Sequence, residues 1–349
     1  MAVFSRGWPM RKTLRLGIGY LALVFWMGPV AAEAVTIYGV TTTNNLLTFD
    51  SATPGTASSV AITGLQAGES VLGIDLRPAN GQLYALGSTS RLYTINPATG
   101  AATQVGSGPF SPALVGTSFG FDFNPVVDRI RVVSDADQNF RLNPDTGAVV
   151  ATDTNLAYAT GDPNFGTNPN VVASAYTSNF AGSTVTTLFG IDSNLDIALI
   201  QGSPDGTPIS PNTGQLFTAL PLFTAGPVPV NTSDAVGFDF SGPPTVGYVS
   251  LTPVTGAASS LYTVGAAEMT LVGTIGTGFI VVDITVGVPG VGPTPTPTPT
   301  RTATPTLTFT SFAGGPAANV PTLSGWGLAA LVLLLGLTGY FVMRGTTAG

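Results

Sequence analysis

The chain has 349 residues, of which 44% are apolar and only 8% are charged. It contains no cysteine and no histidine, which excludes disulfides, thiolate nucleophiles, histidine-ligated metals and Ser-His-Asp triads. Between residues 35 and 285, five arginines and no lysine stand against 17 Asp and Glu, a balance of −12, so we expect no nucleic-acid partner, because phosphate binding needs clustered cations.

Residues 1–34 have the three parts of a secretory signal peptide. Four basic residues come first, an apolar run covers residues 16–30, and the small residues Ala32 and Ala34 follow at the positions that signal peptidase reads. We therefore predict export and cleavage by signal peptidase, with a mature chain that begins near Val35. An uncleaved N-terminal membrane anchor is the alternative.

Residues 35–286 are predicted to form short β-strands, because apolar and polar residues alternate in short runs that turn-forming clusters separate. One unit contains four runs, at residues 71–78, 82–86, 91–95 and 101–105. The last two are joined by Asn-Pro-Ala-Thr-Gly, in which Pro presets the turn and Gly adopts a positive φ. The unit recurs at residues 119–151, more divergently at 171–220, and again at 236–273.

The two ends of this region each lack part of a unit. Residues 36–40, 46–49 and 57–62 supply a second, third and fourth strand, whereas residues 279–285 match the first-strand pattern without followers. Joined, the two ends complete a fifth unit, and repeats of this length are typical of propeller blades. We therefore predict an all-β fold, a β-propeller of five four-stranded blades closed by a C-terminal strand that joins the first blade. A sandwich or an open solenoid is the alternative, but neither explains the divided unit.

Short motifs in the first two complete units carry a resemblance to a known bacterial family. They lie at residues 73–78, 81–84, 120–125, 128–131, 138–141 and 143–147. The region is similar to domain-of-unknown-function family 4394 over nearly all of the exported domain. The resemblance implies a propeller-like extracytoplasmic domain and brings no known activity.

Four of the predicted first strands place an aspartate in the same register: Asp75, Asp122, Asp239 and Asp283. Because first strands surround the axis of a propeller, we expect these carboxylates to line its channel and to be able to bind a cation such as calcium. Carboxylates this close raise one another's pKa, and a divalent ion relieves that repulsion. The alternative is that each carboxylate accepts hydrogen bonds from backbone or hydroxyl groups of a neighbouring blade. No other cofactor is expected.

A second candidate metal site lies in the loop that contains Asp135, Asp137 and Asn139. Oxygen ligands at every second residue are how calcium loops begin. The Gly and Glu that complete an EF-hand are absent, because Phe140 and Thr146 stand at those positions. The alternative is a hairpin loop without a metal.

Arg129, Arg131 and Arg141 are three of the domain's five cations and belong to one unit. Strand alternation places Arg129 and Arg131 on the same face. Together the three can bind a carboxylate or a sulfated sugar. The alternative is that they pair with nearby carboxylates: Asp122, Asp128 or Asp135.

Residues 287–319 form a Gly/Pro/Thr-rich spacer, in which alternating Pro and Thr favour an extended chain. Within the final segment, 320–349, residues 326–343 carry no charge and are just long enough to cross a bilayer as a helix. The segment resembles bacterial C-terminal sorting signals of the IPTL-CTERM type, through Val320, Pro321, Thr322, Leu323, Trp326, Gly327 and Arg344. The resemblance implies that an exosortase-like membrane enzyme recognises Pro-Thr-Leu and cuts the protein. A plain membrane anchor is the alternative.

These features predict an exported protein that is held in the membrane as a precursor and then reaches the cell surface or the extracellular space. We expect a non-enzymatic module that binds or scaffolds a glycan or protein of the envelope or matrix. The alternative is a glycan-active hydrolase that uses two aspartates, since five-bladed propellers host such enzymes. A hydrolase needs two carboxylates about 5 to 9.5 Å apart beside an open cleft.

Overall fold

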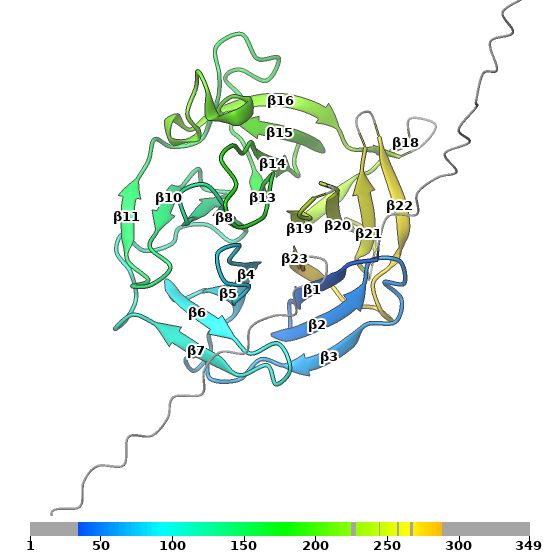
Figure 1. Ribbon diagram of the computed structural model, residues 1–349. Coiled ribbons are helices and arrows are strands. Elements are labelled where there is room, and N and C mark those ends of the chain that lie inside the picture. Colours follow the sequence, from blue (N-terminus) through cyan, green and yellow to red (C-terminus); the bar gives the residue numbers. More distant parts are fainter. Residues whose placement is uncertain (1–33, 225–227, 244, 257, 266–267, 288–349) are drawn as a thin grey trace, which may run out of the picture. The chain divides into compact units, whose positions relative to one another are not determined.

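Five β-sheets surround a common axis in the computed structural model, and each forms one blade of a propeller (Figure 1). The structure describes residues 34–224, 228–243, 245–256, 258–265 and 268–287. All of them belong to one unit of the chain, residues 1–297, whereas the second unit, residues 298–349, lies outside the described ranges. The predicted signal peptide up to residue 33, the spacer from residue 288 and the predicted helix 326–343 also lie outside them. In the described part, no helix has the length and apolar character needed to span a membrane.

Each blade contains the four strands that the alternation predicted, which confirms the five-bladed propeller. From the axis outward, blade 1 has β23 (Val281–Val286), β1 (Thr36–Thr41), β2 (Asn45–Asp50) and β3 (Ser58–Ala61). Blade 2 has β4 (Val71–Leu76), β5 (Leu83–Gly87), β6 (Arg91–Ile95) and β7 (Ala102–Val105). Blade 3 has β8 (Phe119–Asn124), β9 (Arg129–Ser134), β10 (Asn139–Leu142) and β11 (Val149–Thr152).

The last two blades carry additional short strands at their outer edges. Blade 4 has β13 (Val171–Tyr176), β14 (Leu188–Asp192), β15 (Ile197–Gln201), β16 (Gln215–Pro221) and the added β12 (Ala157–Tyr158). Blade 5 has β19 (Thr232–Phe240), β20 (Gly247–Pro253), β21 (Ser260–Val264), β22 (Met269–Thr274) and the added β17 (Phe223–Thr224) and β18 (Val228–Pro229). Both β12 and β17 run parallel to the outermost strand of the next blade, so each connection covers an edge that would otherwise be open.

The ring is closed by β23, as predicted. This strand pairs antiparallel with β1 from Ile37–Val286 to Val40–Asp283, with one irregularity before Thr41. Blade 1 therefore contains strands from both ends of the domain, and β23 covers the inner edge of β1 (Figure 1).

The repeated Asn-Pro-x-Thr-Gly turn also joins neighbouring blades. Gly100 ends it in blade 2, with φ of 72°, and Gly214 ends its counterpart in blade 4, with φ of 69°. A Cβ on Gly100 would lie 2.2 Å from the carbonyl oxygen of Ala61 at the end of β3, and one on Gly214 would lie 2.2 Å from that of Asn155. Glycine is thus required twice, for the left-handed backbone and for the close approach.

Five apolar layers form the core, each between two neighbouring blades. Ile74 packs between blades 1 and 2, Phe121 between blades 2 and 3, and Val171 between blades 3 and 4. Phe238 lies between blades 4 and 5, and Ile284 closes the circle between blades 5 and 1. Because burial is distributed in this way, all five blades are covered on both faces only when the ring is complete.

Candidate functional site

Four of the five inner strands carry an aspartate that reaches toward the next blade: Asp75 on β4, Asp122 on β8, Asp239 on β19 and Asp283 on β23. All four are almost completely buried, with exposed fractions of 0% to 4%. Carboxylate oxygens of Asp75, Asp122 and Asp239 lie within 4.8 Å of one another. The shared register therefore brings three of the four predicted residues into one cluster, which we call the axial triad.

A glycine two residues before three of these aspartates explains how the inner strands come so close. A Cβ on Gly237 would lie 2.4 Å from the backbone nitrogen of Ile284 in blade 1. A Cβ on Gly120 would lie 2.6 Å from the backbone nitrogen of Ser174 in blade 4. Any side chain at these positions would push the blades apart at the axis. In the Gly-x-Asp pattern, the glycine therefore lets two inner strands approach closely, and the aspartate then reaches the backbone of the neighbouring strand.

Each of the four carboxylates accepts a backbone N–H from the inner strand of the next blade. The pairs are Phe123 N with Asp75 (2.7 Å), Tyr176 N with Asp122 (3.0 Å), Val286 N with Asp239 (2.6 Å) and Ile74 N with Asp283 (2.9 Å). The Thr285 hydroxyl also lies 2.7 Å from Asp75 Oδ1 and 3.1 Å from Asp239 Oδ2. In the described part of the chain, the inner strands of neighbouring blades belong to different sheets, so these hydrogen bonds link one blade to the next. They are the contacts expected under the alternative to a bound cation. A bound cation stays a prediction.

Blade 4 lacks an aspartate on its inner strand, and Asn179 supplies the link to blade 5 instead. Its Nδ2 donates to Asp239 Oδ1 at 3.2 Å and to the Phe240 carbonyl at 3.3 Å. The Oδ1 of Asn179 is buried without a hydrogen-bond partner, and so is the hydroxyl of Ser174 on β13. Both residues are 3% exposed. Two buried polar atoms near the axial triad are therefore unsatisfied.

The negative charge at the axis has no basic partner among the described residues, since none of their ion pairs involves these aspartates. Burial raises the pKa of Asp75 to about 7. Burial also holds the pKa of Asp122, Asp239 and Asp283 well above the ordinary value, and neighbouring carboxylates raise it further. The environment thus disfavours four ionised carboxylates unless positive charge joins them.

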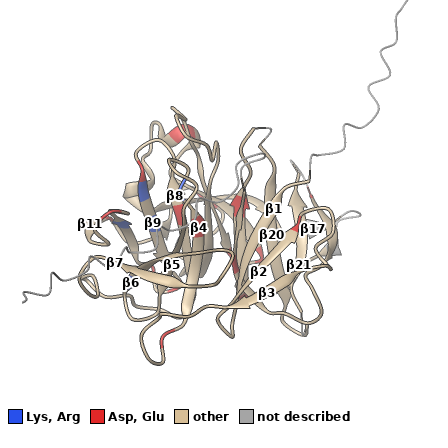
Figure 2. Cartoon of the chain, turned by 60° about the horizontal axis from the view of Figure 1, so that its bottom comes forward, with Lys and Arg blue, Asp and Glu red and all other residues tan. Residues whose placement is uncertain are grey.

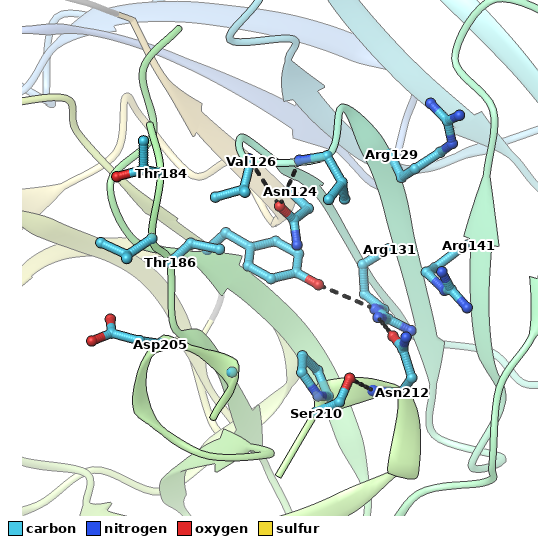
Figure 3. Close-up of a pocket in the computed structure, with 15 residues that line it drawn as sticks. Asn124, Val126, Arg129, Arg131, Arg141, Thr184, Thr186, Asp205, Ser210 and Asn212 are labelled. Carbon is cyan, nitrogen blue, oxygen red and sulfur yellow. Dashed lines mark hydrogen bonds between the residues drawn. The ribbon is translucent and has the colours of Figure 1, made fainter. Parts of the chain in front are cut away.

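The three predicted arginines line a pocket of about 240 Å³ between blades 3 and 4 (Figure 3). Arg129 and Arg131 lie on β9, and Arg141 lies directly opposite Arg131 on β10. On the side of blade 4, the pocket is lined by Tyr176 at the end of β13 and by Asn212 in a turn, and both accept hydrogen bonds from Arg131. Figure 2 shows the basic positions gathered near β8, β9 and β11, whereas acidic positions are spread more widely.

Arg131 is buried, with 1% of its surface exposed, and its donors are fixed. It donates to the carboxylate of Asp153 at 2.7 Å and to the amide oxygens of Asn139 and Asn212 at 2.6 Å. Arg141 donates Nε and Nη2 to the two oxygens of Asp153 at 2.8 and 2.9 Å. Burial opposes the ionisation of Asp153, but the hydrogen bonds from both arginines outweigh it and lower its pKa.

The predicted pairing of the arginines with Asp122, Asp128 or Asp135 is wrong for Arg131 and Arg141, which both pair with Asp153. A register irregularity between β10 and β11 brings the end of β11 beside β10, where the Asp153 N–H donates to the Asn139 carbonyl at 2.8 Å. The carboxylate of Asp128 pairs instead with Arg77 of the preceding blade. Within the described residues, the guanidinium of Arg129 donates one hydrogen bond, to the Asp128 carbonyl at 2.7 Å. The Arg77–Asp128 pair joins two units, so spacing within one unit could not have predicted it.

The loop residues Asp135, Asp137 and Asn139 have separate surroundings. Asp135 accepts hydrogen bonds from the backbone and hydroxyl of Thr117, at 2.9 and 2.6 Å. Asn139 accepts from Arg131, while one oxygen of Asp137 is buried without a partner. The structure therefore places Asp135 in a loop contact and Asn139 in a hydrogen bond with Arg131, and calcium binding by this loop stays a prediction.

Sequence reasoning did not single out Asp153, Asn179, Asn212 or Thr285 as site residues. Asn212 belongs to the Ser-Pro-Asn-Thr-Gly turn that the repeat had marked, but nothing in the turn pattern predicts its bond to Arg131. Thr285 lies two residues after Asp283, so alternation places its hydroxyl on the aspartate face. That signal was available and would have indicated a contact at the axis.

A family model described as "Domain of unknown function (DUF4394)" matches residues 45–285, and a model of the IPTL-CTERM motif matches residues 318–345. No curated protein matches the chain. Among solved structures, the chain is similar to PorZ, a bacterial surface component of the type-IX secretion system of Porphyromonas gingivalis, at 14% identity and a TM-score of 0.33, over 69% of this chain and 28% of PorZ.

Two further similarities are of the same kind. One is to a GH43 glycoside hydrolase, at 11% identity and a TM-score of 0.44, over 67% of this chain and 49% of the enzyme. The other is to TolB from Acinetobacter baumannii, at 13% identity and a TM-score of 0.35, over 73% of this chain and 66% of TolB. The chain spans less than a third of PorZ and about half of the hydrolase. Similarity at this level says nothing about activity.

Proposed function

Because the chain belongs to the DUF4394 family, whose description names no activity, we propose its function from its own residues. It is a cell-surface or exported binding module that takes an acidic ligand, a carboxylated or sulfated glycan, in the pocket of Arg129, Arg131 and Arg141. The single observation that carries this proposal is the gathering of three of the domain's five arginines around one pocket of about 240 Å³. The rest of the domain has the opposite charge.

The internal contacts of the pocket favour binding over a purely structural role for two of the arginines. Arg131 is fully engaged and positions its neighbours, whereas Arg141 has a side chain that is 31% exposed and engages Asp153 through Nε and Nη2. In the described part of the chain, Nη1 of Arg141 has no hydrogen bond and the guanidinium of Arg129 donates only to a backbone carbonyl. Both guanidinium groups can therefore donate to a carboxylate or sulfate without losing an existing ion pair.

The other groups around the pocket suit a sugar. Thr184 and Ser210 contribute hydroxyls, and the buried Tyr176 accepts a hydrogen bond from Arg131 at 3.4 Å. Asp205 is the one carboxylate in the lining, and it can accept from a ligand hydroxyl. A hydrolase is not what this geometry supports best: the pocket offers one carboxylate, and the axial triad, although its carboxylates are close together, is buried.

The proposal is tested by measuring binding of the purified protein to dextran sulfate, polygalacturonate and neutral dextran. Arg141→Gln and Arg129→Gln should each weaken binding to the acidic polymers about tenfold or more, because a hydrogen bond to a charged group contributes about 1.5–3 kcal/mol. Arg91→Gln, on β6 of blade 2, makes the same change of charge away from the pocket and should leave affinity unchanged. Equal weakening by all three, or no preference for acidic polymers, would contradict the proposal.

The sorting motif points to processing by an exosortase-like system and to a cell-surface or exported protein. We further propose that signal peptidase cleaves near Val35, that residues 326–343 hold the precursor in the membrane, and that the exosortase-like enzyme cuts close to Thr322. The Pro/Thr spacer supports this, because an extended segment keeps the cleavage site accessible. Intact-mass measurement of the protein from its native host tests it. A dominant species that still contains residues 328–343 would identify a permanent anchor instead.

A further inference from the structure

We propose that the axial triad of Asp75, Asp122 and Asp239 binds one calcium ion, which ties together the inner strands of blades 2, 3 and 5. The site shares no residue with the pocket of Arg129, Arg131 and Arg141, and the proposal does not depend on the proposed function.

The spacing of the three carboxylates fits one ion. Calcium binds oxygen at 2.3–2.6 Å, so two oxygens that share it lie at most about 5 Å apart. One oxygen from each member of the axial triad lies within 4.8 Å of the other two. The residues come from β4, β8 and β19, so the arrangement exists only because the ring is closed.

The chemistry of the donors selects the metal. The chain has no histidine or cysteine, so only oxygen ligands are available, and these favour hard cations over zinc or copper. Asp75 and Asp239 are held in place by several hydrogen bonds to the backbone and to Thr285. Calcium accepts an irregular oxygen cage of this kind, whereas magnesium demands near-ideal octahedral geometry at 2.0–2.1 Å.

Two unsatisfied buried atoms supply the independent observation that points to a ligand. The amide head of Asn179 contacts Asp239 Oδ1, yet its own oxygen has no partner. The hydroxyl of Ser174 also has none, and it faces β8 beside Gly120, on the strand face that carries Asp122. Buried polar atoms are normally paired, and an amide or hydroxyl oxygen left without a partner beside carboxylates is a suitable neutral ligand for calcium.

The charge balance leads to the same conclusion. The axial triad and Asp283 lie in the interior with no basic partner among the described residues. Asp283 is not a member of the cluster, and its two oxygens accept from Ile74 N and Ile284 N. A buried carboxylate is stable only when it is neutralised or paired, and one divalent ion neutralises two of them.

The experiment measures metal content and thermal stability of the full-length protein. After treatment with EDTA and return of calcium, elemental analysis should find about one calcium per chain, and Tm should rise by roughly 5–10 °C at a hundredfold excess of calcium over Kd. Magnesium at the same concentration should have a much smaller effect. Terbium, which replaces calcium, should show sensitised luminescence that calcium displaces.

Two matched variants locate the ion. Asp122→Asn keeps the shape of the side chain and its acceptor for Tyr176 N, but it should abolish the bound calcium and the rise in Tm. Asp283→Asn makes the same change at a buried aspartate of the same ring outside the axial triad, and it should retain both. Wild-type protein without stoichiometric calcium, or equal loss of calcium in both variants, would overturn the proposal. Metal analysis of the wild type decides the first point even if a variant fails to fold.

Discussion

Removal of the closing strand should unfold the propeller, although β23 is only six residues long. Its apolar side chains Val281, Ile284 and Val286 are 0–2% exposed and fill the layer between blades 5 and 1. Burying each is worth roughly 1.5–3 kcal/mol, or about 5–9 kcal/mol for the three. Domains of this kind have a total stability of about 5–15 kcal/mol, so this loss alone removes much of it.

The hydrogen bonds of β23 add to this loss. Deleting the strand leaves the inner edge of β1 unpaired over Ile37 to Thr41 and removes the links of β23 to Asp239 and to the backbone of Ile74. An exposed edge of this kind also favours aggregation. The deletion should therefore yield protein that aggregates or lacks a cooperative unfolding transition.

The assay compares two truncations, one that ends at Gly276 and one that ends at Gly287. Both lack the spacer and the sorting segment, so they differ only in residues 277–287, which contain the closing strand. Circular dichroism during thermal and urea unfolding should show a cooperative transition only for the longer protein. If the shorter protein stays soluble and unfolds at the same midpoint, blade 1 is stable without its inner strand and the ring argument is wrong.

Three other changes test individual contacts. Gly214→Ala should lower Tm more than Gly68→Ala does. Both glycines have a positive φ, and the backbone strain of an alanine there is worth about 1–2 kcal/mol in either variant. Only at Gly214 would the added Cβ also meet a carbonyl oxygen, 2.2 Å away. Asp153→Asn should lower the free energy of unfolding by about 3 kcal/mol at pH 7, because it leaves a buried arginine poorly paired. The pKa of Asp153 is lowered in the folded state, so its contribution to the free energy of unfolding is complete above the unfolded pKa of about 3.9 and is lost as pH falls through the folded-state pKa. Urea titrations should therefore show a smaller difference in stability between wild type and Asp153→Asn at pH 3 than at pH 7. Tyr158→Phe removes a 2.7 Å hydrogen bond to the buried carboxylate of Asp192 and should cost roughly 1–3 kcal/mol in the same titration; an unchanged midpoint would mean that the carboxylate finds another donor.

Much of the fold was predictable because its signals are local. Alternation of period two marks each strand, and the Asn-Pro-x-Thr-Gly turn sets where the outer hairpin reverses. The divided unit at the two ends then required a strand such as 281–286 to join 36–41, which β23 and β1 do. The short strands β12 and β17 were not predicted, because two-residue segments have no periodicity and form only against an edge that another blade provides.

The site divides in the same way. The sequence by itself determined that four aspartates occupy the same position of their strands, since the alternation of side chains along a strand is a property of the local chain. It also determined that Arg129, Arg131 and Arg141 belong to one unit. Only the tertiary structure decided that Asp75, Asp122 and Asp239 form a cluster without Asp283, because distances across the axis depend on how the inner strands are staggered.

The pairing of the arginines was decided at the same level. Spacing favoured carboxylates close in sequence, but the irregular register between β10 and β11 places Asp153 beside Arg131 and Arg141. Blade 4 then brings Asn212 to Arg131, 81 residues away in the chain. Contacts of this kind depend on the angle and spacing between blades, which packing of the apolar layers determines and no local pattern encodes.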